Sequence, residues 1–133
     1  MSAANVEVVQ KLFEAIGRDD LEEALRYVHP DGEWVNPDYA MEPGIRRGRS
    51  GVGIAFTALR DAFAELRVDA SEMVDLGDRV LVGGTFSGVG RVSDAAFGPQ
   101  PFGSLITMAD GQVKRYEWFL TPEEAREAAG LSG

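Results

Sequence analysis

The segment FGSLITMADGQVKRYEWFL, residues 102–120, predicts two β-strands joined by a tight turn. Asp110 and Gly111 mark the turn, because an Asp-Gly pair accepts the positive backbone angles of a two-residue hairpin. Side chains along residues 102–109 and 112–120 would then alternate between the two faces of a sheet. This hairpin indicates that the second half of the chain forms a β-sheet.

The residues before this hairpin extend the predicted sheet. Residues 68–76 alternate between apolar and polar side chains, and Gly77-Asp78 predicts another tight turn. Residues 79–92 are expected to form a long strand, whose four glycines suggest bulges or bending. Residues 93–101 contain glycine and proline, so we expect a loop there.

The first half of the chain has helical periodicity instead. Apolar residues predict an amphipathic helix over 6–16, a short helix over 21–28, and a third helix whose buried stripe runs from Val52 to Leu66. Ser50 is the expected N-cap of the third helix.

Between the second and third helices the sequence predicts irregular structure. His29-Pro30-Asp31-Gly32 is a helix breaker, residues 33–36 favour a short strand, and residues 38–48 favour a loop. After the sheet, Thr121, Pro122 and Glu124 predict the start of a short C-terminal helix.

This order of elements predicts one α+β domain over residues 1–133. Three N-terminal helices would pack on a strongly bent antiparallel sheet, and a short C-terminal helix would follow. A bent sheet that wraps over helices leaves a concave space, which is where ligand sites are usually found.

Composition excludes several functional classes. The chain has 133 residues, no cysteine and one histidine, so disulfides, thiolate nucleophiles and His-rich metal sites are not expected. Its 22 acidic and 13 basic residues give a formal net charge of −9, which disfavours nucleic acids and anionic membranes. No apolar segment reaches the roughly 20 residues of a membrane span, and no secretory signal pattern is visible, so we expect a cytoplasmic location.

Several short motifs occur in an order that is typical of one superfamily. They are residues 5–13, Asp20-Leu21, HPDGEW at 29–34, GRSGV at 48–52, LGDRVLV at 76–82, DGQV at 110–113 and EEAREAAGL at 123–131. Together they resemble the SnoaL-like branch of the nuclear-transport-factor superfamily, which includes steroid delta-isomerases, polyketide cyclases and limonene epoxide hydrolases. The resemblance implies a cone-shaped fold with a deep apolar pocket, usually in a homodimer.

The resemblance also indicates where catalytic residues would lie. In the steroid isomerases, a carboxylate at the end of the first strand moves a proton, and two donors stabilise the dienolate. The matching positions here are Asn36 for the base, and Leu12 and Ser104 for the donors. An amide cannot act as a base near neutral pH, so the isomerase base is missing.

The other two chemistries of the superfamily lack their acids as well. The Arg and Asp residues of the epoxide hydrolases match Gly84, Phe86 and Trp118, and the aspartate of the cyclases also matches Trp118. A one-residue bulge in the last strand would reverse its faces and bring Glu117 inward instead. No catalytic residue is therefore assigned from the sequence.

Strand alternation predicts an aromatic and almost uncharged pocket lining. If Asn36 faces inward, so does Trp34, and Tyr116 shares a face with Trp118. Such a lining suits a flat hydrophobic ligand, although the same aromatics could simply fill the core. The predicted substrate-binding residues are Trp34, Asn36, Phe56, Phe86, Ser104, Ile106, Tyr116 and Trp118.

A few charged residues outside this lining have two possible interpretations. His29 could act as a base or could stabilise the turn in which it lies. Arg46, Arg47 and Arg49 could hold a ligand carboxylate or could pair with neighbouring acids. The loop carboxylates Asp38 and Glu42, and also Arg91 and Asp94, are similarly open. Arg115 and Glu117 are expected to face outward on the sheet, where a partner subunit could cover them.

Three functional hypotheses follow. The first is an isomerase, cyclase or hydrolase of a small hydrophobic ketone, polyketide or terpenoid, and the second is a non-catalytic protein that binds such a molecule. The third is a structural dimer whose pocket has collapsed. The expected partners are a hydrophobic small molecule and a second copy of the chain, with no nucleic acid and no membrane. We expect no metal and no organic cofactor, because ligand clusters and a phosphate-binding glycine loop are missing from the sequence.

Overall fold

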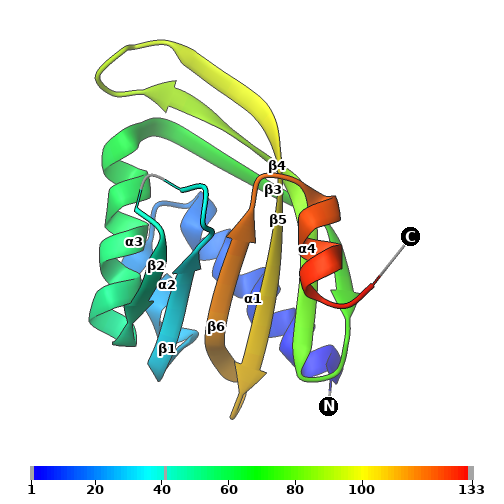
Figure 1. The fold of residues 1–133 in the computed structure, drawn as a ribbon. Helices are drawn as coiled ribbons and strands as arrows, with labels where there is room; N and C mark the ends of the chain where they lie inside the picture. The colour runs from blue at the N-terminus through cyan, green and yellow to red at the C-terminus, as the bar shows by residue number, and fades with distance from the viewer. Residues whose placement is uncertain (1, 41, 132–133) are drawn as a thin grey trace.

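The computed structural model describes residues 2–40 and 42–131 and has the predicted α+β architecture (Figure 1). Its elements, in chain order, are α1 (Ser2–Gly17), α2 (Leu21–Arg26), β1 (Val28–Asn36), β2 (Gly44–Arg47), α3 (Gly48–Ala62), β3 (Phe63–Asp75), β4 (Arg79–Gly90), β5 (Ala96–Ala109), β6 (Gln112–Phe119) and α4 (Pro122–Ala128).

All six strands belong to one sheet with the order β2-β1-β6-β5-β4-β3. The expectation of a purely antiparallel sheet is wrong for one pair, because β1 and β6 run parallel. Alternation of side chains predicts that a strand exists but not its direction. A parallel pair needs a long crossover, and here the whole segment from β2 to β5 connects the two strands.

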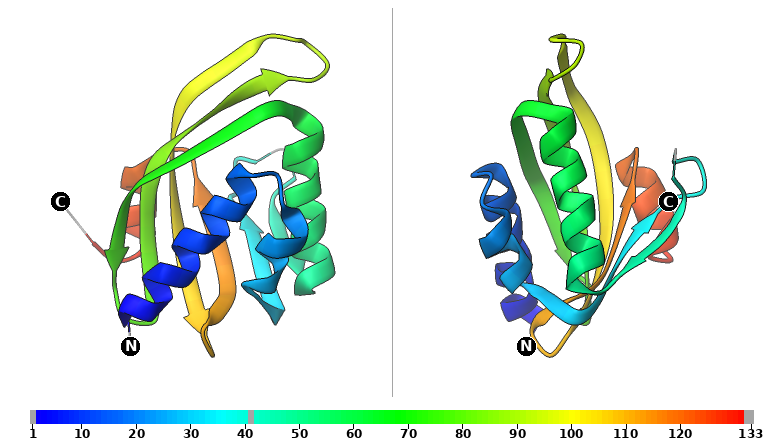
Figure 2. Two further views of the ribbon diagram at one scale, coloured as in Figure 1. Left: turned by 180° about the vertical axis from the view of Figure 1, so that it is seen from behind. Right: turned by 90° about the vertical axis from the view of Figure 1, so that its left-hand side faces the viewer.

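The sheet bends around the three N-terminal helices. Register shifts interrupt the β3–β4 ladder between Ala64 and Arg67 and again between Asp69 and Glu72. Such irregularities bend strands and increase their twist, as the glycine-rich sequence of β4 suggested. Helices α1, α2 and α3 lie on the concave face, whereas α4 lies on the opposite face (Figure 2).

The main core fills the space between those helices and the concave face. Along β5, Ser104, Ile106 and Met108 point into this core, whereas Leu105 points the other way and packs with Ala125 under α4. The period of two in β5 therefore separates a large core from a small one.

Turn and cap chemistry agrees with the sequence at both ends of the β5–β6 hairpin. Asp110 and Gly111 both have positive φ angles, 55° and 74°, as the Asp-Gly pair predicted. Thr121 is the N-cap of α4, and its hydroxyl accepts the backbone N–H of Glu124. Pro122 occupies the first turn of that helix, where its missing N–H costs nothing.

The predicted boundaries between residues 28 and 50 are partly wrong. The second helix ends at Arg26, and residues 28–32 belong to β1 rather than to a helix end and a breaker. The β1–β6 register skips from Val28 to Glu33, so the ladder does not need the N–H that Pro30 lacks.

The predicted loop over 38–48 contains the short edge strand β2, which pairs with β1. Helix α3 begins at Gly48 rather than after Ser50, because Gly48 turns the chain with a φ of +76° that glycine adopts easily.

Two further boundaries differ because one sequence pattern fits two structures. Phe63 and Leu66 continue the helical stripe of α3, yet they lie in β3, where Phe63 pairs with Gly90. The predicted loop over 93–101 begins earlier and is shorter, because β5 starts at Ala96 despite its glycine and prolines. A register shift between Phe86 and Gly88 accommodates these residues in the projecting β4–β5 hairpin (Figure 1).

Among the residues that the structure describes, no helix has both the length and the apolar character that a bilayer span requires.

The contact between α4 and β5 yields a test of the packing. A Cβ added at Gly103 would lie 2.7 Å from the Thr121 carbonyl oxygen and 2.8 Å from the Ala125 Cβ. We predict that Gly103→Ala lowers the free energy of unfolding by about 1–3 kcal/mol in urea denaturation, because α4 must move. Gly17→Ala is the control, since a Cβ there meets no atom within 4 Å. Equal stability of Gly103→Ala and the wild type would contradict the described packing.

Candidate functional site

Asn36 lies at the end of β1 and uses both ends of its side-chain amide. Its Oδ1 accepts hydrogen bonds from the indole Nε1–H groups of Trp34 and Trp118, each at 2.7 Å. Its Nδ2 donates to the backbone carbonyl oxygen of Glu42 at 2.9 Å. Because the three side chains meet at one atom, Trp34, Asn36 and Trp118 lie on the same face of the sheet, as strand alternation predicted.

The aromatic rings beside Asn36 form a continuous stack. Trp34 and Tyr116 are opposite each other in the β1–β6 register, and their rings stack in parallel with centroids 4.6 Å apart. Phe56 of α3 meets the Trp34 ring edge-on at 5.7 Å. The parallel pair β1–β6 and helix α3 therefore hold three of the predicted lining residues together.

Tyr116 also takes part in a buried pair of hydroxyl groups. Ser104 on β5 is fully buried, and its Oγ donates to the Tyr116 hydroxyl oxygen at 2.9 Å. Burial raises the pKa of Tyr116 to about 12, although the hydrogen bond from Ser104 opposes part of this shift. The Tyr116 hydroxyl is therefore neutral near pH 7, so it can donate a hydrogen bond but cannot act as a base.

The remaining predicted lining residues, Ile106 and Phe86, are placed differently. Ile106 is fully buried on β5 opposite Tyr116 and belongs to the close-packed core. Phe86 is half-buried on β4, where its ring contacts Phe97 and Phe102. Ser104 is the only buried polar or charged residue among those the structure describes, so the interior there contains no carboxylate.

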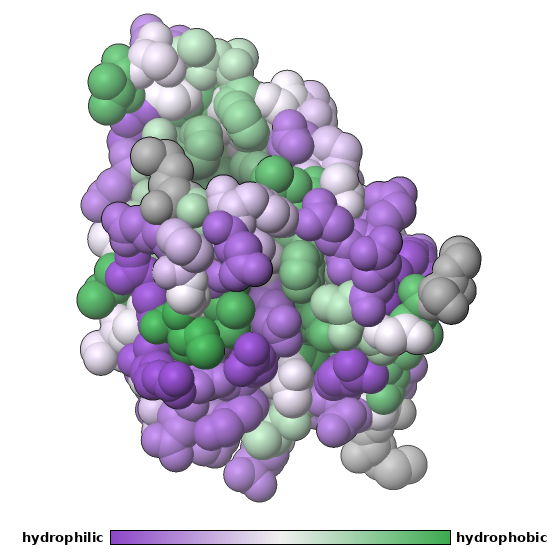
Figure 3. All heavy atoms as spheres, in the orientation of Figure 1, coloured by the Kyte–Doolittle hydropathy of each residue, from purple (hydrophilic) through white to green (hydrophobic). Residues whose placement is uncertain are grey.

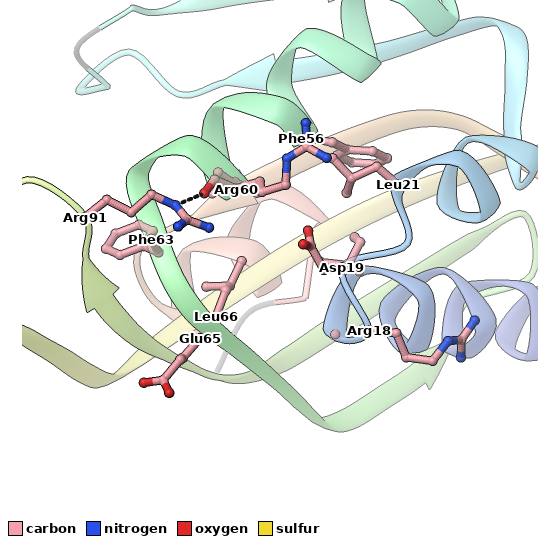
Figure 4. A pocket seen from close by; sticks show the side chains of 12 residues that line it. Arg18, Asp19, Leu21, Phe56, Arg60, Phe63, Glu65, Leu66 and Arg91 are labelled. Atoms are coloured by element: carbon pink, nitrogen blue, oxygen red, sulfur yellow. Dashed lines mark hydrogen bonds between the residues drawn. The ribbon is translucent and has the colours of Figure 1, made fainter.

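A pocket is present, but it lies apart from most of the predicted lining residues. A pocket of about 170 Å³ opens between the C-terminal ends of α1 and α3 and the start of β3 (Figure 4). Phe56 is the one predicted lining residue that reaches it. The pocket is lined by Ile16, Gly17, Arg18, Asp19, Leu21, Phe56, Leu59, Arg60, Phe63, Glu65, Leu66 and Arg91. We call this space the mouth pocket.

Sequence reasoning missed most of the mouth pocket. Arg18, Asp19 and Arg60 follow or end helices, and Glu65 lies in an irregular part of β3, where periodicity gives no inward direction. The sequence alone gives no single interpretation of Arg91. Hydrophobic periodicity predicts which residues are buried, but it does not predict where their packing leaves an open pocket.

Glu117 faces away from the interior. Its carboxylate accepts from Arg115 Nε at 3.1 Å, and Arg115 also pairs with Glu33 at 3.1 Å, which in turn pairs with Arg47. This ion-pair network lies on the outer face of β1, β2 and β6. The β5–β6 ladder has a register shift between Thr107 and Met108, and Glu117 nevertheless faces outward.

The other charged candidates have structural partners. His29 Nδ1 accepts the backbone N–H of Asp31 at 3.0 Å, and its Nε2 lies 3.5 Å from an Asp110 carboxylate oxygen. Both contacts support the interpretation in which His29 stabilises the turn where it lies.

Arg46 pairs with Glu42 at 2.6 Å, and Arg49 donates to the Val28 carbonyl oxygen at 2.8 Å. Within residues 2–40 and 42–131, no group of three or more His, Cys, Asp or Glu side chains could hold a metal ion.

The raised pKa of Tyr116 gives a pH-dependent prediction. The unfolded tyrosine loses its proton near its ordinary value of 10, whereas the folded one keeps it to about 12. Stability is therefore complete below pH 10 and falls as the pH rises toward 12. We expect a loss of about 2 kcal/mol in the free energy of unfolding.

Urea unfolding at pH 9 and pH 12 measures this loss, and Tyr116→Phe provides the comparison. The variant starts less stable, because Ser104 loses its partner, but its stability should fall by about 2 kcal/mol less between the two pH values. An identical fall in both proteins would show that the Tyr116 hydroxyl is not buried as described.

Comparisons with known proteins identify the family and the fold. Similar solved structures include two that are about one quarter identical to this chain. TerC, co-crystallised with polyporic acid, is 25% identical with a TM-score of 0.77, over 93% of this chain and 96% of that one. An NTF2-like protein of unknown function from Burkholderia pseudomallei is 26% identical with a TM-score of 0.76, over 93% and 95% of the two chains.

A third structure supports the fold alone. It is a proposed SnoaL-like polyketide cyclase from Jannaschia sp. CCS1, 21% identical with a TM-score of 0.78 over 88% of this chain and 85% of that one. No curated protein sequence matches the chain. A family model described as a SnoaL-like domain matches residues 9–116. The chain therefore belongs to the SnoaL-like domain family and has the NTF2-like fold.

Proposed function

We propose that this protein binds a small hydrophobic molecule, of the class of ketones, polyketides or terpenoids, through its mouth pocket. The observation that carries the proposal is the apolar floor of that pocket at Phe56, whose ring meets Trp34, which in turn stacks on Tyr116. Flat aromatic rings of this kind favour flat apolar ligands. The structural similarity to TerC, which was crystallised with polyporic acid, also supports a small-molecule ligand.

The size of the pocket limits the ligand. Sites for drug-sized molecules usually enclose roughly 300–1,000 Å³, whereas the mouth pocket has about 170 Å³. A molecule of one or two rings matches this space, and a longer molecule would leave part of itself in solvent. We therefore expect a compact ligand, or one that inserts only its ring end.

The chemistry of the interior supports binding ahead of catalysis. Proton transfer next to a carbonyl needs a base, and the position that resembles the isomerase base holds Asn36. The Asn36 amide is already engaged with Trp34, Trp118 and the Glu42 carbonyl. These groups can orient a ligand but cannot accept a proton from it.

One observation supports an enzyme as the second candidate. The Ser104–Tyr116 hydroxyl pair is neutral and buried, which suits a donor to a carbonyl oxygen that develops negative charge. Because Ser104 and Tyr116 are buried, core side chains would have to move before a substrate could reach this pair. In this case a carboxylate from the rim would have to supply the base.

Binding can be tested with 2-acetylnaphthalene, a neutral two-ring ketone, by isothermal titration calorimetry. We predict that it binds the wild type and that Leu59→Trp weakens binding by about tenfold or more, because the larger side chain fills the mouth pocket. Ala58→Trp is the control, since Ala58 is the exposed neighbour on α3 and does not line the pocket. Absence of binding, or equal loss in both variants, would contradict the proposal.

The same ketone separates the two candidates. In deuterated buffer, a protein that only binds should leave the methyl protons of the ketone exchanging at the buffer rate, as followed by NMR. Exchange that is faster with the protein, and slower again with Tyr116→Phe, would instead support the enzyme.

We also propose that two copies pair through the outer face of β1, β2 and β6. The network of Glu33, Arg47, Arg115 and Glu117 on this face contains equal numbers of acids and bases, so this network carries no net charge that would repel a second copy. Hydrophobic side chains form a small patch over β1 and β2, surrounded by hydrophilic ones (Figure 3). Ile45 of β2 is 41% exposed.

This pairing predicts a dimer at micromolar concentrations in sedimentation velocity. Ile45→Asp should give monomers, because it places a charge in the centre of the contact. Ile54→Asp is the control, since Ile54 is also an exposed isoleucine but lies on α3. A monomeric wild type, or dimers that Ile45→Asp leaves intact, would overturn the proposed pairing.

A further inference from the structure

The mouth pocket is unusually basic for this protein. The whole chain has a formal net charge of −9, yet the charged residues that line the pocket are three arginines and two carboxylates. Because acidic residues outnumber basic ones in the whole chain, the composition would predict a net negative charge around the pocket, and the excess of arginines there is the opposite.

The three arginines also lack acidic partners. Six arginine–carboxylate ion pairs and a His29–Asp110 contact are formed among the described residues, and none of them includes Arg18, Arg60 or Arg91. Most of the other arginines on the surface pair with a carboxylate or, like Arg49 and Arg79, donate to a carbonyl oxygen. The positive charge around the pocket is therefore available to a ligand.

Arg91 is held in a fixed orientation. Its Nε donates to the Arg60 carbonyl oxygen at 2.7 Å, and its backbone N–H donates to the Ala62 carbonyl oxygen at 3.1 Å (Figure 4). These bonds leave the two terminal amino groups of the guanidinium free, and the guanidinium points toward the pocket. An arginine that is already oriented loses less conformational entropy when it binds a two-oxygen anion.

The two carboxylates of the rim are not equivalent. Figure 4 shows the Glu65 side chain directed away from the pocket and the Asp19 carboxylate directed toward its middle. Arg18 also points away from the pocket. Figure 4 shows Arg91 at one side of the space, whereas the Arg60 side chain ends beside Phe56 and Leu21, with the Asp19 carboxylate below it.

We infer that the ligand carries an acidic group, a carboxylate, which Arg91 and Arg60 hold at the rim while its apolar rings enter the mouth pocket. This inference rests on the proposed function, because it adds a charge to the hydrophobic ligand proposed above. The apolar floor at Phe56 cannot solvate an anion, so the charge must stay at the rim. The Asp19 carboxylate, directed toward the middle of the pocket, repels the anion and limits how strongly it binds.

A matched pair of probes tests the charge alone. 2-Naphthoate and 2-naphthamide have nearly the same shape, but only the first is an anion at pH 7. In calorimetric titrations we expect 2-naphthoate to bind the wild type about fivefold or more tightly than 2-naphthamide. Raising the salt concentration should weaken the binding of 2-naphthoate and leave the binding of 2-naphthamide unchanged, because salt screens only the interaction of the charged probe.

Three variants test the named residues. Arg91→Gln and Arg60→Gln should each weaken the binding of 2-naphthoate by about fivefold. Asp19→Asn should strengthen its binding by about two- to threefold. Asp19 has a φ of +59°, which asparagine also accepts, so this variant keeps the fold. Arg67→Gln is the control, because Arg67 is exposed on β3 and does not line the pocket. None of the four should change the binding of 2-naphthamide.

Each outcome supports or overturns a specific statement. Equal binding of both probes, with no effect of the variants, would overturn the acidic ligand and leave the proposed binding of a hydrophobic molecule intact. If neither naphthalene probe nor the neutral ketone binds, both proposals fail. Should Arg91→Gln fail to fold, the opposite shift expected of Asp19→Asn and the salt dependence still decide the question.

Discussion

A single amide oxygen organises the junction between the two parallel strands. Asn36 Oδ1 accepts both indole N–H groups, and those indoles come from β1 and β6. Two partly buried donors thus share one acceptor, which satisfies the requirement that buried polar groups find partners. The same interaction keeps Trp34 at the position where it stacks on Tyr116 and meets Phe56. The contact therefore helps to hold the rings of Trp34, Tyr116 and Phe56 together.

The choice of an amide at position 36 also determines the electrostatics. A carboxylate could accept from both indoles, but it could not donate to the Glu42 carbonyl as Asn36 Nδ2 does. It would also place a charge beside two aromatic rings. With an amide, the interior is neutral, and Tyr116 remains protonated across the physiological range. The amide of Asn36 therefore completes the local hydrogen bonding without adding a charge.

Sequence reasoning predicted the elements of this fold better than their boundaries. The β5–β6 hairpin and the cap of α4 were predictable, because Asp-Gly and Thr-Pro-x-Glu each act within four residues. The helical stripe of α3 continued wrongly into Phe63 and Leu66, since both residues are apolar in either structure. The parallel pairing of β1 and β6 is a contact between residues far apart in sequence, and alternation carries no information on strand direction.

The same distinction applies to the site. Alternation placed Trp34, Asn36, Tyr116 and Trp118 on one face, and their contacts agree with that face. It could not distinguish rings that fill space from rings that border it, and the open volume lies at the helix ends instead. An amphipathic ligand is expected to bind in one orientation. Its apolar rings can enter the neutral aromatic interior at no electrostatic cost, whereas its anionic group would lose its hydration there and stays at the arginines of the rim. In a protein that is acidic overall, two correctly placed arginines can therefore determine which end of such a molecule enters first.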